Sequence, residues 1–361
     1  MNHHTDKTST HHTTIHATMH TTTARAPKPL IIAELSGNHN QNLNLALQSI
    51  QAAKECGADF VKLQTYTPDC LTINAKTRYF QIDSRTIWDG QNLYELYKQA
   101  CTPFEWHKEL FAFAKSIDIG IFSSPFSKRA LELLESLNCP MYKIASFEIT
   151  DLELIALVAS TKKPIIISTG IATHNEIIDA IEVCKNAGND NITLFLCTSS
   201  YPAPIADANI AYMPKLAQYG TKYGLSDHTL GDVCAIAATA LGANMIEKHF
   251  ILDRSLGGVD SAFSMDKQEF ALMVERVNNA YLALGDGTLH RDERALQSQR
   301  KFARSLFVCQ DIQKNEILNS ENIRSIRPGF GLPPKLLPMI LGKKATKNLH
   351  RGEPLCEGDF E

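Results

Sequence analysis

The chain has 361 residues and a formal net charge of −3, with 44% hydrophobic residues. This length is too great for one small domain and fits a barrel with an appended domain. The near-neutral charge gives no sign of a nucleic-acid partner, and no apolar run is long enough to span a bilayer. Because the N-terminus lacks the apolar core of a signal peptide, we expect a cytoplasmic protein. The nine cysteines never form C-x-x-C, which favours free thiols.

Residues 1–29 form a leader that is rich in His and Thr and almost free of apolar side chains. Such a segment cannot bury enough surface to fold alone, so we expect it to be disordered. The irregular spacing of its histidines favours a polar leader over a metal site.

Residues 30–284 alternate short apolar runs with segments of helical period. The runs are LIIAEL, DFVKLQT, IGIFSSP, MYKIAS, PIIISTG, ITLFLCTS, KYGLSD and MIEKHF. One intervening segment, residues 42–56, places Leu43, Leu47, Ile50 and Ala53 on one face and is followed by Gly57. A doubly wound open sheet is the competing fold. Eight regularly spaced runs over somewhat more than about 250 residues favour a (β/α)8 TIM barrel.

One connection, residues 65–103 after the second run, is unusually long and contains Trp88, Tyr94 and Tyr97. In a barrel this segment belongs to the face that carries catalytic residues. The sequence leaves two interpretations open, a lid over the substrate and an insertion packed on the rim.

The chain beyond the barrel divides into two parts. Residues 285–304 are charged and lack strand pattern, which predicts a linker or a linker helix. Residues 305–361 contain an internal echo, because DIQKNEILNSENI from Asp311 resembles NLHRGEPLCEGDF from Asn348. We therefore expect a small, β-rich, pseudo-symmetric domain.

Polar side chains gather where the eight runs end, and in a TIM barrel these ends build the catalytic face. In chain order the ends present Glu34; Lys62 and Gln64; Ser123 and Ser124; Lys143, Ser146 and Glu148; Ser168; Ser199 and Tyr201; Ser226, Asp227 and His228; and Glu247, Lys248 and His249.

Two of these strand ends carry lysines. Burial of Lys62 and Lys143 is costly unless an anion compensates them. For either lysine alone a structural ion pair is the simpler explanation, but the two together, among several hydroxyls, predict a pocket for a phosphate and a carboxylate.

Two histidines end adjacent strands. His228 and His249 could meet at one ion, and two imidazoles completed by substrate and water oxygens suit a divalent metal such as zinc, manganese or cobalt.

Taken as ordered motifs, these residues resemble the sialic acid synthase family. The resemblance runs from about Leu30 to the C-terminus through IAELSGNHN, ADFVKLQT, FSSPF, YKIASFE, IISTG, CTSSYP, GLSDHT, EKHFILD and GGVDSAFS. Within the family, the segments SGNHN, LQTYTPD, IWDGQNLYELY, TPFEWH and VDSAFS look most like pseudaminic acid synthases.

The resemblance implies condensation of phosphoenolpyruvate with an open-chain N-acetylated sugar, 2,4-diacetamido-2,4,6-trideoxy-L-altrose, with release of phosphate by C–O cleavage. It assigns phosphoenolpyruvate to Lys62, Ser124, Lys143, Ser146, Ser168, Ser199 and Ser226. It assigns a divalent metal, usually manganese, to His228 and His249. Glu34, Gln64, Glu148, Tyr201 and Asp260 match positions that face the sugar or the reacting centre. Lys62 and Lys143 would fix the enol, and either Glu34 or Glu148 would activate water.

The C-terminal segment resembles the antifreeze-like (SAF) domain of these synthases. In the family this domain caps the partner's active site in a domain-swapped homodimer, and Arg327 matches the arginine that reaches the sugar. The alternatives are an N-acetylneuraminate or legionaminate synthase, a Schiff-base aldolase and a non-catalytic sugar-binding protein.

Overall fold

The structure is a computed structural model that describes residues 27–83, 87–287 and 292–361. The predicted disorder of the leader concerns residues that lie, apart from 27–29, outside these ranges. The chain divides into two compact units, residues 1–287 and 288–361. Each unit is described by itself below.

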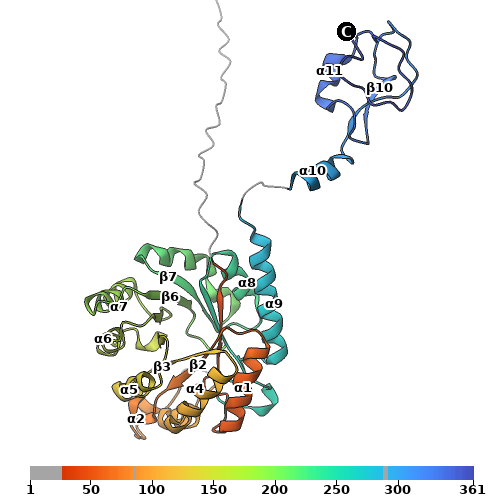
Figure 1. The fold of residues 1–361 in the computed structure, drawn as a ribbon. Helices are drawn as coiled ribbons and strands as arrows, with labels where there is room; N and C mark the ends of the chain where they lie inside the picture. Colours follow the sequence, from red (N-terminus) through yellow and green to blue (C-terminus); the bar gives the residue numbers. More distant parts are fainter. Residues whose placement is uncertain (1–26, 84–86, 288–291) are drawn as a thin grey trace, which may run out of the picture. The chain divides into compact units, whose positions relative to one another are not determined.

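The first unit is a closed barrel of eight parallel strands (Figure 1). The strands are β1 (Leu30–Glu34), β2 (Phe60–Thr65), β3 (Gly120–Pro125), β4 (Tyr142–Ile144), β5 (Ile165–Ser168), β6 (Ile192–Cys197), β7 (Lys222–Asp227) and β8 (Met245–His249). Each strand pairs with the next, and β8 returns to β1 with Glu34 opposite His249. The predicted TIM barrel is therefore confirmed, and each predicted run contains one strand.

Helices cover the outside of the barrel (Figure 1). They are α1 (Leu43–Glu55), α2 (Pro68–Leu71), α3 (Leu93–Ala100), α4 (His107–Ser116), α5 (Lys128–Ser136), α6 (Leu152–Ala159), α7 (His174–Asn186), α8 (Val233–Ala240) and α9 (Lys267–Leu284), with 3-10 turns η1 (Arg78–Phe80), η2 (Phe104–Trp106), η3 (Ser146–Glu148), η4 (Ile205–Ala208), η5 (Ile210–Tyr219) and η6 (Arg254–Leu256). Helix α1 begins where the Asn42 side chain accepts a hydrogen bond from the Leu45 amide, and Gly57 follows it at a φ of +88°.

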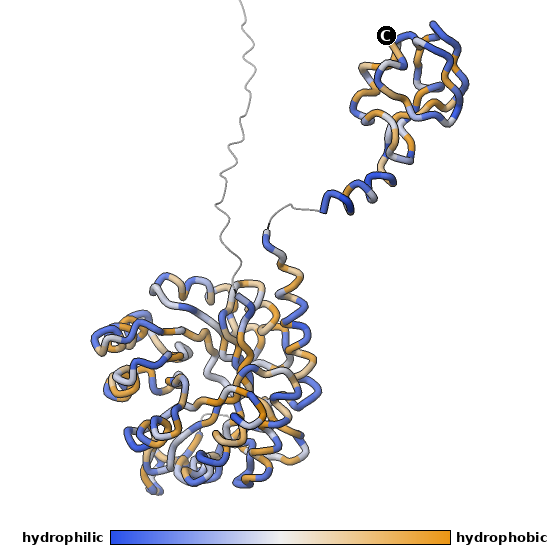
Figure 2. The backbone as a smooth tube through the Cα atoms, in the orientation of Figure 1, coloured by the Kyte–Doolittle hydropathy of each residue, from blue (hydrophilic) through white to orange (hydrophobic). Residues whose placement is uncertain are grey.

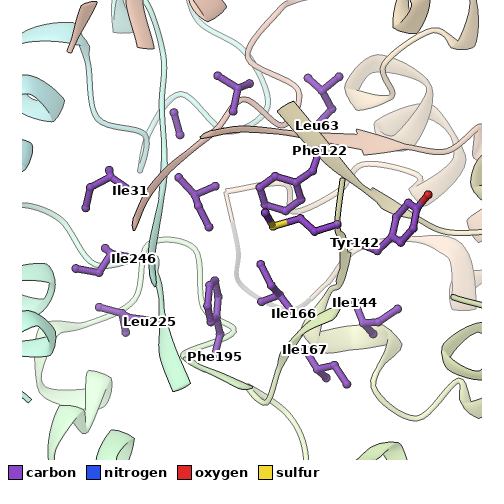
Figure 3. Packing of buried hydrophobic residues seen from close by; sticks show 14 of the residues in the cluster. Ile31, Leu63, Phe122, Tyr142, Ile144, Ile166, Ile167, Phe195, Leu225 and Ile246 are labelled. Carbon is purple, nitrogen blue, oxygen red and sulfur yellow. The ribbon is translucent and has the colours of Figure 1, made fainter. Parts of the chain in front are cut away.

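The strands bury both of their faces. In Figure 3, Phe122, Ile166 and Phe195 point toward one another inside the barrel, while Ile31, Leu63 and Ile246 point away toward the helices. Apolar segments alternate with polar ones along the helices of this unit (Figure 2), as a one-sided apolar face requires. The inward positions nearer the carboxyl ends are polar instead, because the alternation of the strands brings Lys62, Lys143 and Glu247 to the inside there.

A buried polar layer ties the long connection after β2 to the barrel. His39 Nε2 lies 3.2 Å from Thr102 Oγ1, and His107 Nε2 lies 2.7 Å from Thr65 Oγ1. The Trp106 ring packs edge-on against His39, with 5.4 Å between the ring centroids. Burial and, to a smaller extent, the neighbouring His107 together lower the pKa of His39 to about 4. Hydrogen bonds therefore fix both ends of the connection, at Thr65 to His107 and at Thr102 to His39.

The second unit contains α10 (Glu293–Arg300), β9 (Ser305–Val308), β10 (Ile323–Ile326), η7 (Pro334–Leu336) and α11 (Leu337–Ile340). Helix α10 falls inside the segment predicted as a linker. Strands β9 and β10 pair in antiparallel fashion, and Leu306, Ile312, Ile323 and Leu355 belong to a separate small core.

The internal echo of the sequence is a structural repeat. Ile312 and Leu349, which are equivalent in the two copies, exchange a pair of backbone hydrogen bonds of 2.9 Å. The Lys314 amide donates to Asn348 Oδ1 and the Arg351 amide donates to Asp311 Oδ1, both at 2.8 Å. Each copy thus binds the other in the same way, which confirms the expected pseudo-symmetric, β-rich domain.

Among the described residues, no helix is both long and apolar enough to cross a bilayer. The nine cysteines are all free, as their spacing predicts.

We predict that His39 makes the barrel less stable in acid. The unfolded chain takes up a proton near the ordinary histidine pKa of about 6.5, whereas folded His39 stays neutral down to about pH 4. The contribution of His39 to the free energy of unfolding is therefore fully present above pH 6.5. It falls by up to about 3 kcal/mol as the pH is lowered toward 4. Urea unfolding followed by tryptophan fluorescence measures this, because Trp88 and Trp106 both lie in the first unit.

Two variants separate the proton from the hydrogen bond. His39→Asn should reduce the slope of the unfolding free energy against pH by the equivalent of about one proton. Thr102→Val should lower the free energy of unfolding at every pH and leave this slope unchanged. An unchanged slope in His39→Asn would contradict the assignment.

Candidate functional site at the carboxyl ends of the strands

The centre of the site is a buried cluster of two carboxylates and two ammonium groups. Lys62 Nζ lies 2.9 Å from Glu34 Oε2 and 3.5 Å from Glu247 Oε1. Lys143 Nζ donates to both oxygens of Glu247 at 3.0 Å. Ser226 Oγ also donates to Glu247 Oε1, at 3.1 Å. Strands β2, β4 and β7 therefore meet at the Glu247 carboxylate of β8, and β1 is joined to them through the Lys62–Glu34 pair.

The charges in this cluster fix its ionisation. Burial alone would raise the pKa of Glu247, but attraction to Lys143 and Lys62 outweighs burial and lowers it to about 2. Burial would lower the pKa of Lys62, yet Glu247 and Glu34 raise it above its usual value. Burial shifts the other two groups in the opposite sense, raising the pKa of Glu34 and lowering that of Lys143. The cluster therefore holds as many carboxyl groups as amino groups, and losing the charge on Glu34 and on Lys143 together leaves its net charge unchanged.

A second set of hydrogen bonds joins β1 and β2 to the loop after β8. Gln64 Nε2 donates to Glu34 Oε1 at 2.7 Å and to Ser36 Oγ at 3.0 Å. Ser36 in turn donates to Asp260 Oδ2, which also accepts a 3.4 Å bond from the Gly37 amide. The structure thus brings Glu34, Gln64 and Asp260 into one chain of contacts.

The predicted serines lie around this centre. Ser146 and Ser199 share a 2.7 Å hydrogen bond, and an added Cβ at Gly170 would collide with the Ser199 hydroxyl. The hydroxyls of Ser124 and Ser168 are buried and have no hydrogen-bond partner among the described residues. Buried hydroxyls without partners are costly, so these two groups are available to a bound oxyanion.

His228 and His249 face each other, with 5.3 Å between the ring centroids. His228 Nδ1 lies 2.9 Å from the carbonyl oxygen of Thr198, so this nitrogen carries a proton and Nε2 is the one that can bind an ion. Burial would lower the pKa of His228, but Cys197 and the Thr198 carbonyl together outweigh burial and raise it above its usual value. Burial lowers the pKa of His249 well below its usual value, with His228 and the nearby lysines acting in the same direction. His249 Nδ1 is buried without a hydrogen-bond partner within the described ranges.

The ring nitrogens of His228 and His249 are suitable ligands for a metal ion. Neutral imidazoles with free lone pairs are common ligands of divalent ions. The described residues contain no group of three or more His, Cys, Asp or Glu side chains that could hold an ion. An ion at His228 and His249 would therefore keep positions open for water or substrate oxygens.

An aromatic wall stands beside the histidines. Phe263 packs at 4.8 Å from His249 and Tyr201 at 4.4 Å from His228, measured between ring centroids. Trp88, from the long connection after β2, contacts Tyr201 at 5.7 Å and donates its Nε1–H to the Val259 carbonyl at 2.8 Å. Tyr94, which the sequence also placed in the long connection, is not part of this wall, because its hydroxyl donates to Asp69 at the surface.

Glu148, at the end of η3, is largely enclosed. Burial, together with the nearby Asp151, raises its pKa to about 7. Arg327 belongs to the C-terminal unit, where it is exposed just after β10, and its assignment stays a prediction.

Sequence reasoning missed the role of Glu247 and that of Ser36. Glu247 stands two residues before His249 on β8, so the alternation of the strand puts both inside the barrel. That periodicity could have identified it. Ser36, which has a φ of +45°, lies in a turn that no pattern in the sequence predicts.

We predict that Glu247→Gln destabilises the protein and that a bound oxyanion restores part of the lost stability. The amide keeps the shape of the side chain but leaves Lys143 buried without a counter-charge, at a cost of about 3–5 kcal/mol. Thermal unfolding should show a lower Tm, and inorganic phosphate should raise the Tm more in the variant than in the parent. Glu135→Gln, which breaks a partly exposed pair with Lys163, should change stability by less than about 1 kcal/mol. Equal stabilisation of both proteins by phosphate would contradict the prediction.

Comparison with known proteins agrees with this site. The NeuB family model matches residues 49–289, and the SAF domain model matches residues 303–361. A pseudaminic acid synthase from Helicobacter pylori is 58% identical over 92% of this chain and 98% of its own length. One from Campylobacter jejuni is 48% identical over 92% of this chain and 97% of its own. An N,N'-diacetyllegionaminic acid synthase from Campylobacter jejuni is 37% identical over 91% of this chain and 99% of its own.

Solved structures give the same result. An N-acetylneuraminic acid synthetase from Leptospira borgpetersenii superposes with a TM-score of 0.66 at 30% identity, covering 75% of this chain and 90% of that one. A spore coat polysaccharide biosynthesis protein from Bacillus subtilis gives 0.62 at 28% identity, covering 94% and 96%. The family model spans more than half of the chain, so the chain belongs to the NeuB family of sialic acid synthases.

Proposed function

We propose that the chain condenses phosphoenolpyruvate with 2,4-diacetamido-2,4,6-trideoxy-L-altrose and water to give pseudaminic acid and phosphate. The observation that carries this proposal is the strand-end cluster of Lys62, Lys143 and buried hydroxyls beside the His228–His249 pair. The choice of sugar rests on the higher identity to pseudaminic acid synthases than to legionaminic acid synthases.

Lys62 and Lys143 would hold the phosphate and carboxylate of phosphoenolpyruvate, with Ser124, Ser146, Ser168, Ser199 and Ser226 around them. Two anionic groups on one small substrate match two ammonium groups and several hydroxyl donors. Because Glu34 and Glu247 already balance the lysines, a further positive charge would favour this trianionic substrate.

We propose that a divalent ion at His228 and His249 supplies that charge, and manganese is the usual ion in the family. When bound, such an ion polarises the aldehyde oxygen of the sugar. The chain contributes two imidazoles, and that of His228 is oriented by the hydrogen bond from its Nδ1 to the Thr198 carbonyl.

Glu148 is our choice for the carboxylate that handles water, an assignment that sequence reasoning left open between Glu34 and Glu148. Glu34 is bound by both Lys62 and Gln64, whereas Glu148 has a pKa of about 7 and can exchange a proton near neutral pH. In the proposed reaction, the C2=C3 electrons of phosphoenolpyruvate form a bond to the aldehyde carbon, and the aldehyde oxygen takes up a proton. Water adds at C2 and loses a proton. The C2–O bond to phosphate then breaks as the new C2 hydroxyl gives up its proton, which leaves the C2 ketone.

Gln64, Tyr201 and Asp260 would contact the sugar. Trp88 and Phe263 extend the wall that Tyr201 begins, and an apolar face of this kind suits the methyl and acetamido groups of a 6-deoxy sugar. An apolar wall rejects an added hydroxyl only weakly, so we expect some activity with related sugars.

We further propose a cytoplasmic homodimer, with Arg327 of one chain serving the sugar of the other. The family resemblance supports the dimer. Phe147, Ile171, Ile205 and Leu230, from the loops after β4 to β7, are each about half exposed or more and would be covered in such an assembly. Nine free thiols suit a reducing compartment.

The reaction predicts metal-dependent phosphate release with one sugar. Chelator-stripped protein should release phosphate from phosphoenolpyruvate with the diacetamido altrose sugar after manganese is restored, and much more slowly with N-acetylmannosamine or the legionaminate precursor. His249→Ala should be folded and inactive. Faster release of phosphate with another sugar would mean that this other sugar is the preferred substrate. A metal-free reaction with pyruvate would favour a Schiff-base aldolase. Binding of sugar without consumption of phosphoenolpyruvate would indicate a non-catalytic protein.

The pH dependence tests Glu148. If its carboxylate takes the proton from water, kcat/KM should rise through about pH 7 as the group ionises. Glu148→Gln should lower kcat/KM by about 10²–10⁴-fold and remove this limb.

Asp151→Asn provides the matched control. An asparagine still caps α6, where Asp151 accepts from the Leu154 amide, but it no longer raises the pKa of Glu148. The limb should therefore move to lower pH with the plateau retained. A limb that stays in place in both variants would exclude Glu148 as its origin.

A further inference from the structure

A second buried ion pair joins β7 to β8 on the opposite side of the strands from the site. Lys248 Nζ lies 2.7 Å from Asp227 Oδ2, and both side chains are about 1–2% exposed. Because side chains alternate along a strand, Lys248 points outward between Glu247 and His249, which point inward. Asp227 directly precedes His228. Each partner of the pair is therefore covalently next to one of the two facing histidines.

Lys248 uses its ammonium group to hold the loop after β7. In addition to Asp227, Nζ donates to the Thr229 carbonyl and, at 2.8 Å, to the Gly231 carbonyl. Its three N–H groups are thus all engaged. Gly231 adopts a φ of +77°, the left-handed conformation that lets the loop turn and present these carbonyls to one point.

Asp227 fixes the same loop with its other oxygen. Oδ1 accepts from the Thr229 amide at 2.9 Å and from the Thr229 hydroxyl at 2.7 Å. The Ala203 amide donates to the His228 carbonyl at 3.0 Å. The backbone of His228 is therefore held at the residue before it, at its own carbonyl and at the residue after it.

The strand pairing alone does not need this arrangement. The register of β7 and β8 is formed by backbone bonds, and a buried ion pair is often no more stabilising than apolar residues of the same size. What the pair adds is a fixed orientation for the turn that carries His228 and for the end of β8 that carries His249.

We propose that Lys248 and Asp227 are positioning residues for the His228–His249 pair, which hold the two imidazoles in the arrangement that binds a divalent ion. The inference rests on the metal site of the proposed function. Residues behind metal ligands that fix the ligand ring commonly contribute 10–100-fold to metal affinity.

The test compares Lys248→Met with Arg276→Met in the full chain. Arg276 forms an ion pair of 2.8 Å with Asp232 on the same loop, but at the surface, so it is a matched loss of charge. Electron paramagnetic resonance of free Mn²⁺ gives the Kd of the metal, and calorimetry gives the Kd of phosphoenolpyruvate. We expect Lys248→Met to raise the Mn²⁺ Kd by about 10–100-fold, while the Kd of phosphoenolpyruvate for the metal-free protein stays within about twofold of the parent. Arg276→Met should change neither.

Nitrogen-15 spectra of the metal-free protein add a readout that stability alone does not move. Parent and Arg276→Met should show His228 with its proton on Nδ1, and Lys248→Met should show a mixture of tautomers. Asp227→Asn is the second variant if Lys248→Met does not fold, and it should raise the Mn²⁺ Kd in the same direction.

Mn²⁺ affinity within twofold of the parent in a folded Lys248 or Asp227 variant, with the His228 tautomer retained, would overturn the proposal. A parent that binds no Mn²⁺ at all would instead overturn the metal site of the proposed function. In that case the tautomer spectra would still decide whether Lys248 orients His228.

Discussion

The site depends on one buried carboxylate, that of Glu247. It is the group that Lys143, Lys62 and Ser226 share, and no other described side chain links so many strands of the barrel. Two lysines inside a barrel would be expensive to bury alone, and attraction to Glu247 keeps Lys62 charged in the folded protein. The same arrangement leaves the protein groups of the site near electrical balance. Tight binding of a highly anionic substrate then requires an added cation.

The barrel gives the inner and outer faces of its strands different roles. The inner face of each strand near its carboxyl end carries the reactive groups, and the inner face below carries Phe122, Ile166 and Phe195, which exclude water from beneath them (Figure 3). The outer face packs against helices, and at the carboxyl ends of β7 and β8 the Asp227–Lys248 pair takes the place of apolar contacts. Orientation of the site is therefore built into residues that never face a substrate.

Much of this architecture was accessible from the sequence because it follows from periodicity. Runs such as PIIISTG and ITLFLCTS predicted the eight strands, and their ends predicted that Lys62, Lys143, His228 and His249 would face one space. The repeat in residues 305–361 predicted the pseudo-symmetry that the Asp311–Arg351 and Lys314–Asn348 bonds display.

Other features of the site depend on contacts between distant segments, which local patterns do not encode. The partner of Lys143 is on β8, 104 residues away along the chain, and Trp88 reaches the aromatic wall from the long connection after β2. The pKa of Glu148 likewise depends on how deeply the folded loops bury it. Reasoning from strand ends left Glu34 and Glu148 as alternatives for the group that handles water, and our proposal of Glu148 rests on the hydrogen bonds of Glu34 and on the raised pKa of Glu148.

The most direct test of this account is a calorimetric titration of phosphoenolpyruvate into chelator-stripped protein and into protein saturated with Mn²⁺. A site whose lysines are already balanced by Glu34 and Glu247 should bind the anion weakly without the metal and at least about tenfold more tightly with it, a coupling of about 1.4 kcal/mol. Equal affinity in the two titrations would contradict the view that charge balance at Glu247 makes substrate binding depend on an added cation.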